Sequence, residues 1–182
     1  HMAAMDTALA IIGAHADKVD GIKISLLSAE KEIAMRRRLP AGVKMYTGDD
    51  FNYAELIAGD AEGHSHALLG IFDAIAPVAS AALERLGAGD EERFHALLGP
   101  TVPLSRHIFK APTRFYKTGV VFLAYLNGHQ DHFLMAAGQQ GARSLVHFAE
   151  LFRLADAARC LADPDRAAAR MASLLKLGGV DQ

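Results

Sequence analysis

The 182-residue sequence predicts an α/β fold in which a small parallel sheet is followed by a long helical region. Three short apolar segments, separated by helical segments, lie within residues 21–72, and helical patterns continue from Pro77 to the end. Strands that alternate with helices pair in parallel through crossover connections. Because parallel sheets are normally buried on both faces, three such strands indicate part of a larger fold.

Apolar periodicity and turn residues define the elements of the first half of the chain. They predict a helix over residues 3–16, a strand over 21–27, a helix over 28–39, a strand over 42–47, a helix over 51–58 and a strand over 66–72. Ser28 is expected to cap the second helix and Pro40 to end it. His1 and Met2 are interpreted as a cloning remnant ahead of the first helix.

Three consecutive arginines, Arg36 to Arg38, fall in the last turn of the helix predicted over residues 28–39. Cations are stabilised there because the C-terminal end of a helix dipole is negative. A phosphate site is the alternative, but favourable placement already accounts for the charges. We therefore interpret the three side chains as facing solvent.

Helical patterns account for the second half, with breaks at Gly, Pro and Asn-Gly positions. The predicted helices cover residues 78–86, 90–98, 101–109, 113–126, 139–161 and 164–177. The expected domain organisation is a partial α/β domain over residues 3–77. Residues 78–182 then supply its last helix and a C-terminal helical subdomain.

Composition restricts the classes of protein to which the chain can belong. A 51% hydrophobic and 22% charged composition is ordinary for a globular protein and excludes intrinsic disorder. The net charge of -2 gives no positive excess for phosphate backbones, so nucleic acid is not an expected partner. The single cysteine, Cys160, cannot form an internal disulfide, which favours the cytoplasm. The longest apolar run, residues 120–126, is far shorter than the roughly 20 residues of a membrane span.

Lys23 is the strongest candidate for chemistry. It lies near the middle of a short apolar strand, where burying a charged amine costs several kcal/mol unless the amine is paired or neutral. A buried, neutral amine can attack a carbonyl and form a Schiff base. The alternative is structural, with Lys23 extending to solvent or pairing with an acid such as Asp49, and spacing alone favours this alternative.

The motifs around Lys23 resemble those of the dihydrodipicolinate synthase / N-acetylneuraminate lyase family of class I aldolases. The similar segments are Gly-Ile-Lys-Ile-Ser at 21–25, Gly-Asp-Asp at 48–50, Gly-Ile-Phe-Asp-Ala-Ile-Ala-Pro at 70–77, residues 89–98 and Pro103-Leu104. Residues 111–119, Ala-Pro-Thr-Arg-Phe-Tyr-Lys-Thr-Gly, resemble a bacterial branch known only as dihydrodipicolinate synthase family protein of unknown function.

The resemblance implies that the three strands are the sixth, seventh and eighth of a TIM (β/α)8 barrel, followed by a C-terminal helical subdomain. It covers essentially the whole chain but only the later half of the family. The threonine pair that holds the substrate carboxylate and the tyrosine that relays protons in that family have no counterpart here. We therefore expect a truncated chain that is inactive alone and, with open sheet edges, forms a homo-oligomer.

The resemblance also implies a mechanism. Lys23 would condense with the keto group of a pyruvate-like 2-oxo acid, and the iminium would accept electrons during carbon-carbon bond cleavage or formation with an aldehyde or sugar-derived partner. The substrate-binding residues implied are Gly48, Asp49, Asp50, Gly70 and Ile71. The residue pattern by itself favours turn and helix-cap roles for Asp49 and Asp50.

Two functions from other classes stay open. One is a non-catalytic half-barrel module for oligomerisation, and the other is a barrel relative that binds a sugar-like ligand without chemistry. No cofactor is expected, because residues 138–141 are too sparse for a dinucleotide fingerprint. No metal is expected either, because the histidine pairs at 64/66 and 129/132 lack a third ligand. Cys160 has no histidine at motif spacing, so a catalytic thiol is not expected.

Overall fold

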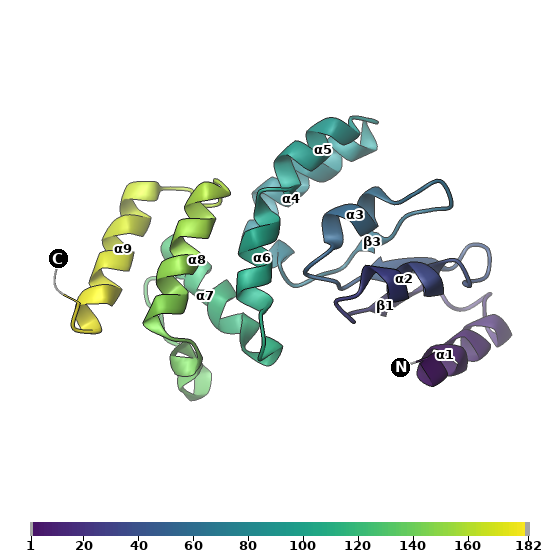
Figure 1. The fold of residues 1–182 in the computed structure, drawn as a ribbon, viewed down its shortest axis with the longest axis horizontal. Helices are drawn as coiled ribbons and strands as arrows, with labels where there is room; N and C mark the ends of the chain where they lie inside the picture. The colour runs from purple at the N-terminus through teal and green to yellow at the C-terminus, as the bar shows by residue number, and fades with distance from the viewer. Residues whose placement is uncertain (1, 181–182) are drawn as a thin grey trace. The chain divides into compact units, whose positions relative to one another are not determined.

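The computed structural model describes residues 2–180 (Figure 1). The chain divides between Gly70 and Ile71 into two compact units, residues 1–70 and 71–182. The expected domain boundary at Pro77 falls inside a helix of the second unit. The interpretation of His1 as a cloning remnant lies outside the described residues, whereas Met2 begins the first helix. No described helix is long and apolar enough to cross a membrane.

The first unit alternates helices and strands. Its described elements are α1 (Met2–Ala14), β1 (Gly21–Ile24), α2 (Ala29–Arg36), β2 (Lys44–Thr47), α3 (Tyr53–Ala58) and β3 (His66–Ala67). The strands form one parallel sheet in the order β1-β2-β3. The prediction of three parallel strands is confirmed, although each strand is shorter than its apolar segment. Ser28 caps α2 as predicted, because its side chain accepts from the backbone N–H of Lys31.

Period-two alternation gives the sheet two different faces. One face carries Ile22, Ile24 and Met45, which belong to a core that α1 and α2 complete with Met5, Ile12 and Met35. The opposite face carries residues that are exposed or half-buried, namely Lys23, Lys44, Tyr46 and His66. The apolar face therefore anchors the sheet, and the polar face is the one on which chemistry can take place.

The prediction of strands six to eight of a TIM barrel is wrong. The structure shows a mainly helical α/β chain with only a three-stranded parallel sheet, and this is not part of a barrel. The third strand pairs over just two residues, and the chain then leads into a helix rather than continuing along the sheet. Strand-helix alternation fixes the parallel direction of the strands. It does not fix how many strands the sheet contains, and the number was taken from the resemblance.

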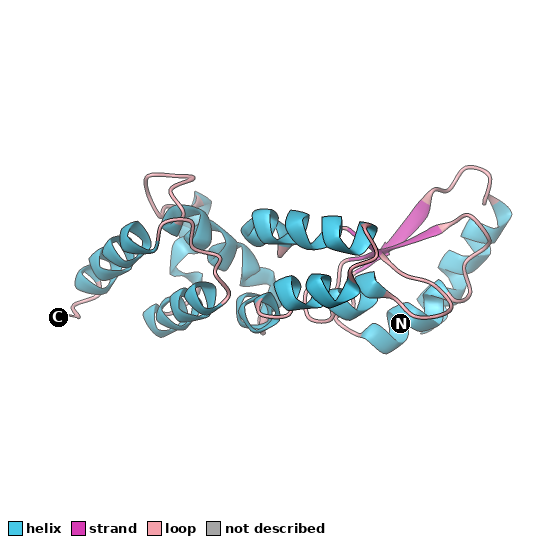
Figure 2. Cartoon of the chain, turned by 90° about the horizontal axis from the view of Figure 1, so that it is seen from above, coloured by secondary structure: helices cyan, strands magenta, loops and turns pink. Residues whose placement is uncertain are grey.

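The second unit is helical throughout its regular structure, as the cyan ribbons of Figure 2 show. Its described elements are α4 (Phe72–Gly87), α5 (Glu91–Leu98), α6 (Thr101–Phe109), η1 (Thr113–Phe115), α7 (Tyr116–Leu126), η2 (Ala136–Ala142), α8 (Leu145–Ala157) and α9 (Pro164–Leu177). The side chains of Asp90, Ser144 and Asp163 each accept a backbone N–H bond at a helix start. The single helix predicted over residues 139–161 is therefore divided, because Ser144 starts a new one.

A kink in α4 follows from its proline. Pro77 has no N–H, and its ring clashes with the carbonyl four residues earlier, so a helix bends or breaks at that point. Ile75 has non-helical angles of φ -125° and ψ 23°. The core of the unit gathers around Phe122, which is 0% exposed and lies 4.8 Å from the Phe148 ring and 5.1 Å from the Phe133 ring, measured between centroids.

Candidate functional site

Lys23 and Gly48 are brought together at the C-terminal edge of the sheet. Parallel strands end at the same edge, so the residues that close β1 and follow β2 become neighbours. A Cβ placed on Gly48 would lie 2.6 Å from Cε of Lys23 and 2.2 Å from Oγ of Ser25. The absence of a side chain at Gly48 therefore leaves the space through which the Lys23 side chain passes.

The Lys23 side chain is exposed, so the expectation of a buried amine is wrong for this chain. Within the described part of the chain it makes no hydrogen bond or ion pair, so pairing with Asp49 is not observed either. The reason lies in the alternation of β1, which places Ile22 and Ile24 on the covered face and Lys23 on the other. The alternative that Lys23 extends to solvent is the arrangement observed.

Asp49 stabilises the turn that precedes α3. It is 1% exposed, and its Oδ1 accepts from the backbone N–H groups of Phe51, at 2.8 Å, and Asn52, at 3.0 Å. Its Oδ2 accepts from Nδ2 of Asn52 at 2.8 Å. The turn interpretation is confirmed for Asp49, whereas the N-cap position of α3 is occupied by Asn52. Both oxygens are used inside the protein, so this carboxylate does not project toward a substrate.

The other three residues implied by the resemblance are distributed differently. Asp50 is buried at 6% exposure beside Asp49. Gly70 is half-buried at the end of the first unit, and Ile71 begins the second. The Ile71 side chain is 0% exposed, and its backbone oxygen accepts from the N–H of Ala74 at the start of α4. Ile71 therefore presents no side-chain surface to a substrate.

A polar group next to Lys23 comes from the neighbouring strand. The register pairs Lys23 with Tyr46, whose hydroxyl donates to Oδ2 of Asp20 at 2.5 Å. Nζ of Lys44 donates to Oδ1 of the same carboxylate at 2.8 Å. The Lys44 ammonium and the Tyr46 hydroxyl hold the pKa of Asp20 below its usual value, and hydrogen bonding to Asp20 raises the pKa of Tyr46. Tyr46 was not among the site residues expected from the sequence, although the alternation of β2 places it on the same sheet face as Lys44.

A buried carboxylate, Glu32, lies behind the Gly48-Asp49 turn. Glu32 is 1% exposed, and its Oε2 accepts from the Thr47 hydroxyl at 3.0 Å. The same Thr47 oxygen accepts from the backbone N–H of Asp49 at 3.1 Å. Burial raises the pKa of Glu32, while the hydroxyls of Ser65 and Thr47 and the Arg36 cation act in the opposite direction. Glu32 therefore supports the turn on which Lys23 rests.

The interpretation of the three arginines as solvent-facing is wrong for Arg36, whose side chain is only 8% exposed. Its Nη2 donates to Asp60 at 2.7 Å, and its Nη1 donates to the Ser65 hydroxyl at 3.4 Å. Arg37 also pairs with Asp60, and Arg38 pairs with Asp6. These ion pairs account for the three charges without a phosphate.

Comparison with known families matches residues 1–180 to a model described as a protein of unknown function, DUF993. The chain belongs to the DUF993 family. No curated protein matches it. The match extends over both units of this DUF993 protein, so the sheet and the helical unit belong to the same family. Because the family's function is unknown, the function of this protein has to be argued from the site.

Two histidines of the DUF993 protein, His64 and His66, lie at or just before β3, the strand that does not pair with the Lys23 strand β1. The rings of His64 and His66 are 5.0 Å apart, and the His66 ring lies 5.5 Å from that of Tyr46. Desolvation lowers the pKa of His66, and the His64 charge acts in the same direction. Among residues 2–180, no group of three or more His, Cys, Asp or Glu side chains is arranged to hold a metal ion.

Replacing Glu32 by glutamine is expected to make this DUF993 protein more stable than the parent, by an amount that increases as the pH rises. The folded-state pKa of Glu32 is raised above its usual value of 4.5, so between these two pKa values the folded state binds more protons than the unfolded state. Folding stability then falls as the pH rises through that window. Below pH 4.5 the parent and Glu32→Gln should differ by only about 1 kcal/mol, the usual net value of one hydrogen bond. Above that pH the free energy of unfolding of the variant should increase relative to that of the parent.

Urea unfolding of both proteins across the pH range measures this difference. The matched control is Glu30→Gln, which changes an exposed carboxylate in the first turn of the same helix. A difference between Glu32→Gln and the parent that is flat with pH, or that falls as the pH rises, contradicts the assignment of a desolvated carboxylate.

Proposed function

We propose that this chain carries the Schiff-base lysine of an aldolase or lyase that acts on a pyruvate-like 2-oxo acid, with Lys23 as the nucleophile. The observation that carries the proposal is the unpaired Lys23 amine at the C-terminal edge of a parallel sheet, with its side chain lying over Gly48. Ligand sites of parallel α/β sheets gather at this edge. The resemblance of residues 21–25, 48–50 and 70–77 to the dihydrodipicolinate synthase / N-acetylneuraminate lyase family supports the same assignment.

The chemistry follows from the amine. The neutral Nζ of Lys23 attacks the keto carbon, the former carbonyl oxygen leaves as water, and a carbon-nitrogen double bond remains. After taking up a proton, this imine becomes an iminium, which accepts the electron pair released when the bond between the α- and β-carbons breaks and becomes an enamine. In the direction of bond formation, the iminium first loses an α-proton, and the resulting enamine supplies the electron pair to the aldehyde carbon. An amine that donates to no neighbouring carboxylate is available for this attack, and Lys23 has no such partner among the described residues.

Support for a small anionic substrate comes from the Lys23 amine itself, because the other lysine of this sheet face, Lys44, is paired with Asp20. Lys44 lies on the same face of the sheet, and Tyr46 occupies the position beside Lys23 on β2. We propose that the substrates are a 2-oxo acid and an aldehyde or sugar-derived partner. We also propose that the protein is cytoplasmic and forms a homo-oligomer, and that neither nucleic acid nor membrane has a role in its function. The outer edges of β1 and β3, which no further described strand pairs with, support association between copies.

A second candidate function is a non-catalytic module. The observation that favours it is that Asp49 uses both carboxylate oxygens within the turn that precedes α3, while Ile71 is fully buried. Two of the residues that the resemblance places around a substrate therefore serve the fold. A binding or association role without turnover is consistent with this use.

Reductive trapping separates the two candidates. The protein is incubated with pyruvate and sodium borohydride, and its intact mass is measured. We expect one reduced adduct per chain, lost in Lys23→Ala and retained in Lys44→Ala, which removes the other lysine of the same sheet face. An undiminished adduct in Lys23→Ala overturns the proposed role. Absence of any adduct in the parent protein favours the non-catalytic module.

A further inference from the structure

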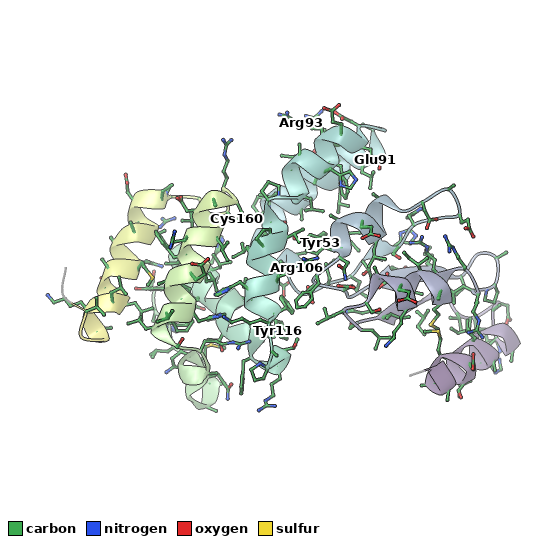
Figure 3. The ribbon with its side chains drawn as sticks, in the orientation of Figure 1. Tyr53, Glu91, Arg93, Arg106, Tyr116 and Cys160 are labelled. Carbon is green, nitrogen blue, oxygen red and sulfur yellow. The ribbon has the colours of Figure 1, made fainter. Side chains whose placement is uncertain are left out.

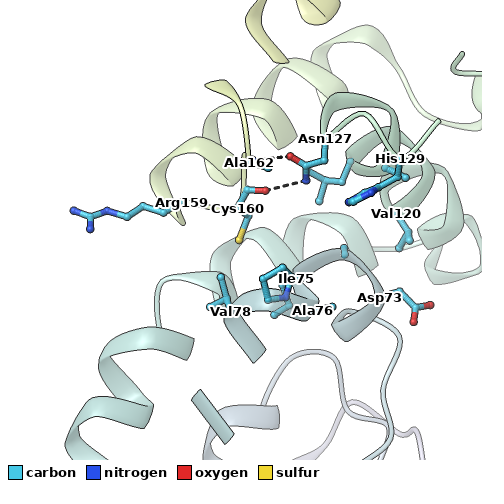
Figure 4. A pocket seen from close by; sticks show the side chains of 14 residues that line it. Asp73, Ile75, Ala76, Val78, Val120, Asn127, His129, Arg159, Cys160 and Ala162 are labelled. Carbon is cyan, nitrogen blue, oxygen red and sulfur yellow. Dashed lines mark hydrogen bonds between the residues drawn. The ribbon is translucent and has the colours of Figure 1, made fainter. Parts of the chain in front are cut away.

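A cavity of about 350 Å³ lies entirely within the second unit (Figure 4). Its walls come from the first turns of α4, from α7 and from the segment that follows α8. Most of the lining is apolar, as shown by Ile75, Val78, Val120, Leu123 and Ala124. The Lys23 site lies in the other unit, so this cavity is a separate feature of the molecule.

The walls of the cavity are fixed by hydrogen bonds. Nδ2 of Asn127 donates to the Cys160 carbonyl at 3.0 Å, and Oδ1 of Asn127 accepts from the N–H of Ala162 at 2.9 Å, as the dashed lines of Figure 4 show. Arg159, directly before Cys160, adopts a positive φ of 55°. On the opposite wall, the kink at Ile75 and Pro77 shapes the start of α4. A cavity with walls held in this way is formed before a ligand arrives.

Few polar groups remain free to meet a ligand. Both amide atoms of Asn127 are used, and the Arg159 side chain extends away from the cavity (Figure 4). The Cys160 sulfur points toward Ile75 and Val78, and burial raises the pKa of the thiol to about 11, so it is a neutral part of the wall. Figure 3 places Cys160 near the C-terminal end of α8.

The acidic residue of the cavity is Asp73, which lies at its rim with the carboxylate directed outward (Figure 4), and His129 is a further polar neighbour. Asp73 is exposed and has no hydrogen bond or ion pair with any residue that the structure describes. No lysine lines the cavity, and its single arginine points away. The site therefore combines an apolar chamber with one unneutralised carboxylate.

We propose that this cavity binds a small aromatic or aliphatic molecule that carries an amine, with the apolar part inside and the amine at Asp73. Ligand pockets have volumes of about 300–1,000 Å³, and a dry apolar cavity of about 150 Å³ already holds benzene. The observed volume accommodates a ring system of roughly indole size. An amine is preferred to an acid because the carboxylate of Asp73 attracts the cation and repels an anion.

Tryptamine and indole-3-propionate are matched probes, because they share an indole ring and carry opposite charges. Cys160 is the only cysteine of the chain, so its reaction with a thiol reagent at pH 8 reports on the cavity alone. We expect saturating tryptamine to slow this reaction at least fivefold, and calorimetric titration to show binding at least tenfold tighter for tryptamine than for indole-3-propionate. In Asp73→Asn the preference between the two probes should fall to less than threefold.

Filling the cavity supplies the second arm of the test. Ala124→Phe occupies the chamber and should abolish tryptamine binding, whereas Ala169→Phe adds the same ring to an exposed position of α9 and should leave binding unchanged. Calorimetry on the unaltered protein decides the matter even when Ala124→Phe fails to fold. The proposal is overturned by absence of tryptamine binding to the parent protein, or by tighter binding of indole-3-propionate.

Discussion

Replacing His147 by leucine is expected to make the protein more resistant to acid unfolding. His147 lies on α8, is 4% exposed and stacks on the ring of His107 of α6 with a centroid separation of 4.2 Å. Neither ring nitrogen of His147 has a hydrogen-bond partner among residues 2–180. Burial lowers the pKa of His147 to about 3, and the charges of His107, Lys110 and Arg143 act in the same direction.

The direction of the effect follows from proton linkage. Between about pH 3 and pH 6.5 the unfolded chain binds a proton at His147 and the folded chain does not. Folding stability therefore falls as the pH is lowered through this window, by about 1.4 kcal/mol for each pH unit. His147→Leu removes this loss. At pH 7 the substitution should be nearly neutral, because it also removes buried ring nitrogens without partners.

Denaturant unfolding of the parent and His147→Leu between pH 7 and pH 4 measures the prediction. The stability of the variant relative to the parent should increase by several kcal/mol toward the acid end. His15→Leu serves as the control for loss of one histidine from an exposed position. Parallel pH profiles for the parent and His147→Leu contradict the assignment of a desolvated histidine.

Replacing Gly48 by alanine is expected to damage both the fold of the first unit and the Lys23 site. The added Cβ would lie 2.9 Å from the backbone oxygen of Ile24, in addition to its close approach to Lys23 and Ser25. Backbone cannot move as freely as a side chain, so the turn or β1 has to shift. We expect the free energy of unfolding to fall by about 1–3 kcal/mol, the usual cost of overpacking. The borohydride adduct with pyruvate should fall at least tenfold, because the Lys23 side chain is displaced.

Gly13→Ala is the matched control for this substitution. Nothing lies within 4 Å of a Cβ placed on Gly13, which is part of α1. Because glycine is unfavourable within a helix, this change should stabilise the protein by roughly 0.5–1 kcal/mol and leave the adduct intact. If Gly48→Ala has the stability and the adduct yield of Gly13→Ala, Gly48 does not set the space for Lys23.

The parts of the fold that the sequence predicted correctly are those determined by local rules. Alternation at residues 21–27 and a serine ahead of Glu30 were sufficient for β1 and for the start of α2. The preference of aspartate for turns correctly predicted the role of Asp49. Each of these features depends on a few residues that are neighbours in the sequence, so the sequence alone is sufficient to predict it.

The failures concern contacts between distant segments. The burial of Arg36 depends on Asp60 and Ser65, which lie 24 and 29 residues away, so its position in the last helical turn suggested the wrong environment. Glu32 of α2 was overlooked because its partner Thr47 lies 15 residues away, in β2. The barrel was wrong because strand-helix alternation does not determine the number of strands. The exposure of Lys23 was predictable from the alternation that places Ile22 and Ile24 on the opposite face.

The central claim is that Lys23 is the nucleophile of this protein. The most direct test is to locate the reduced pyruvate adduct by peptide mass spectrometry, with the seven lysines of the chain compared in one digest. The account predicts that the adduct is concentrated on Lys23, with Lys44 and Lys18 unmodified at the same pyruvate concentration. An adduct spread evenly over the exposed lysines, or concentrated on a lysine of the helical unit, contradicts it.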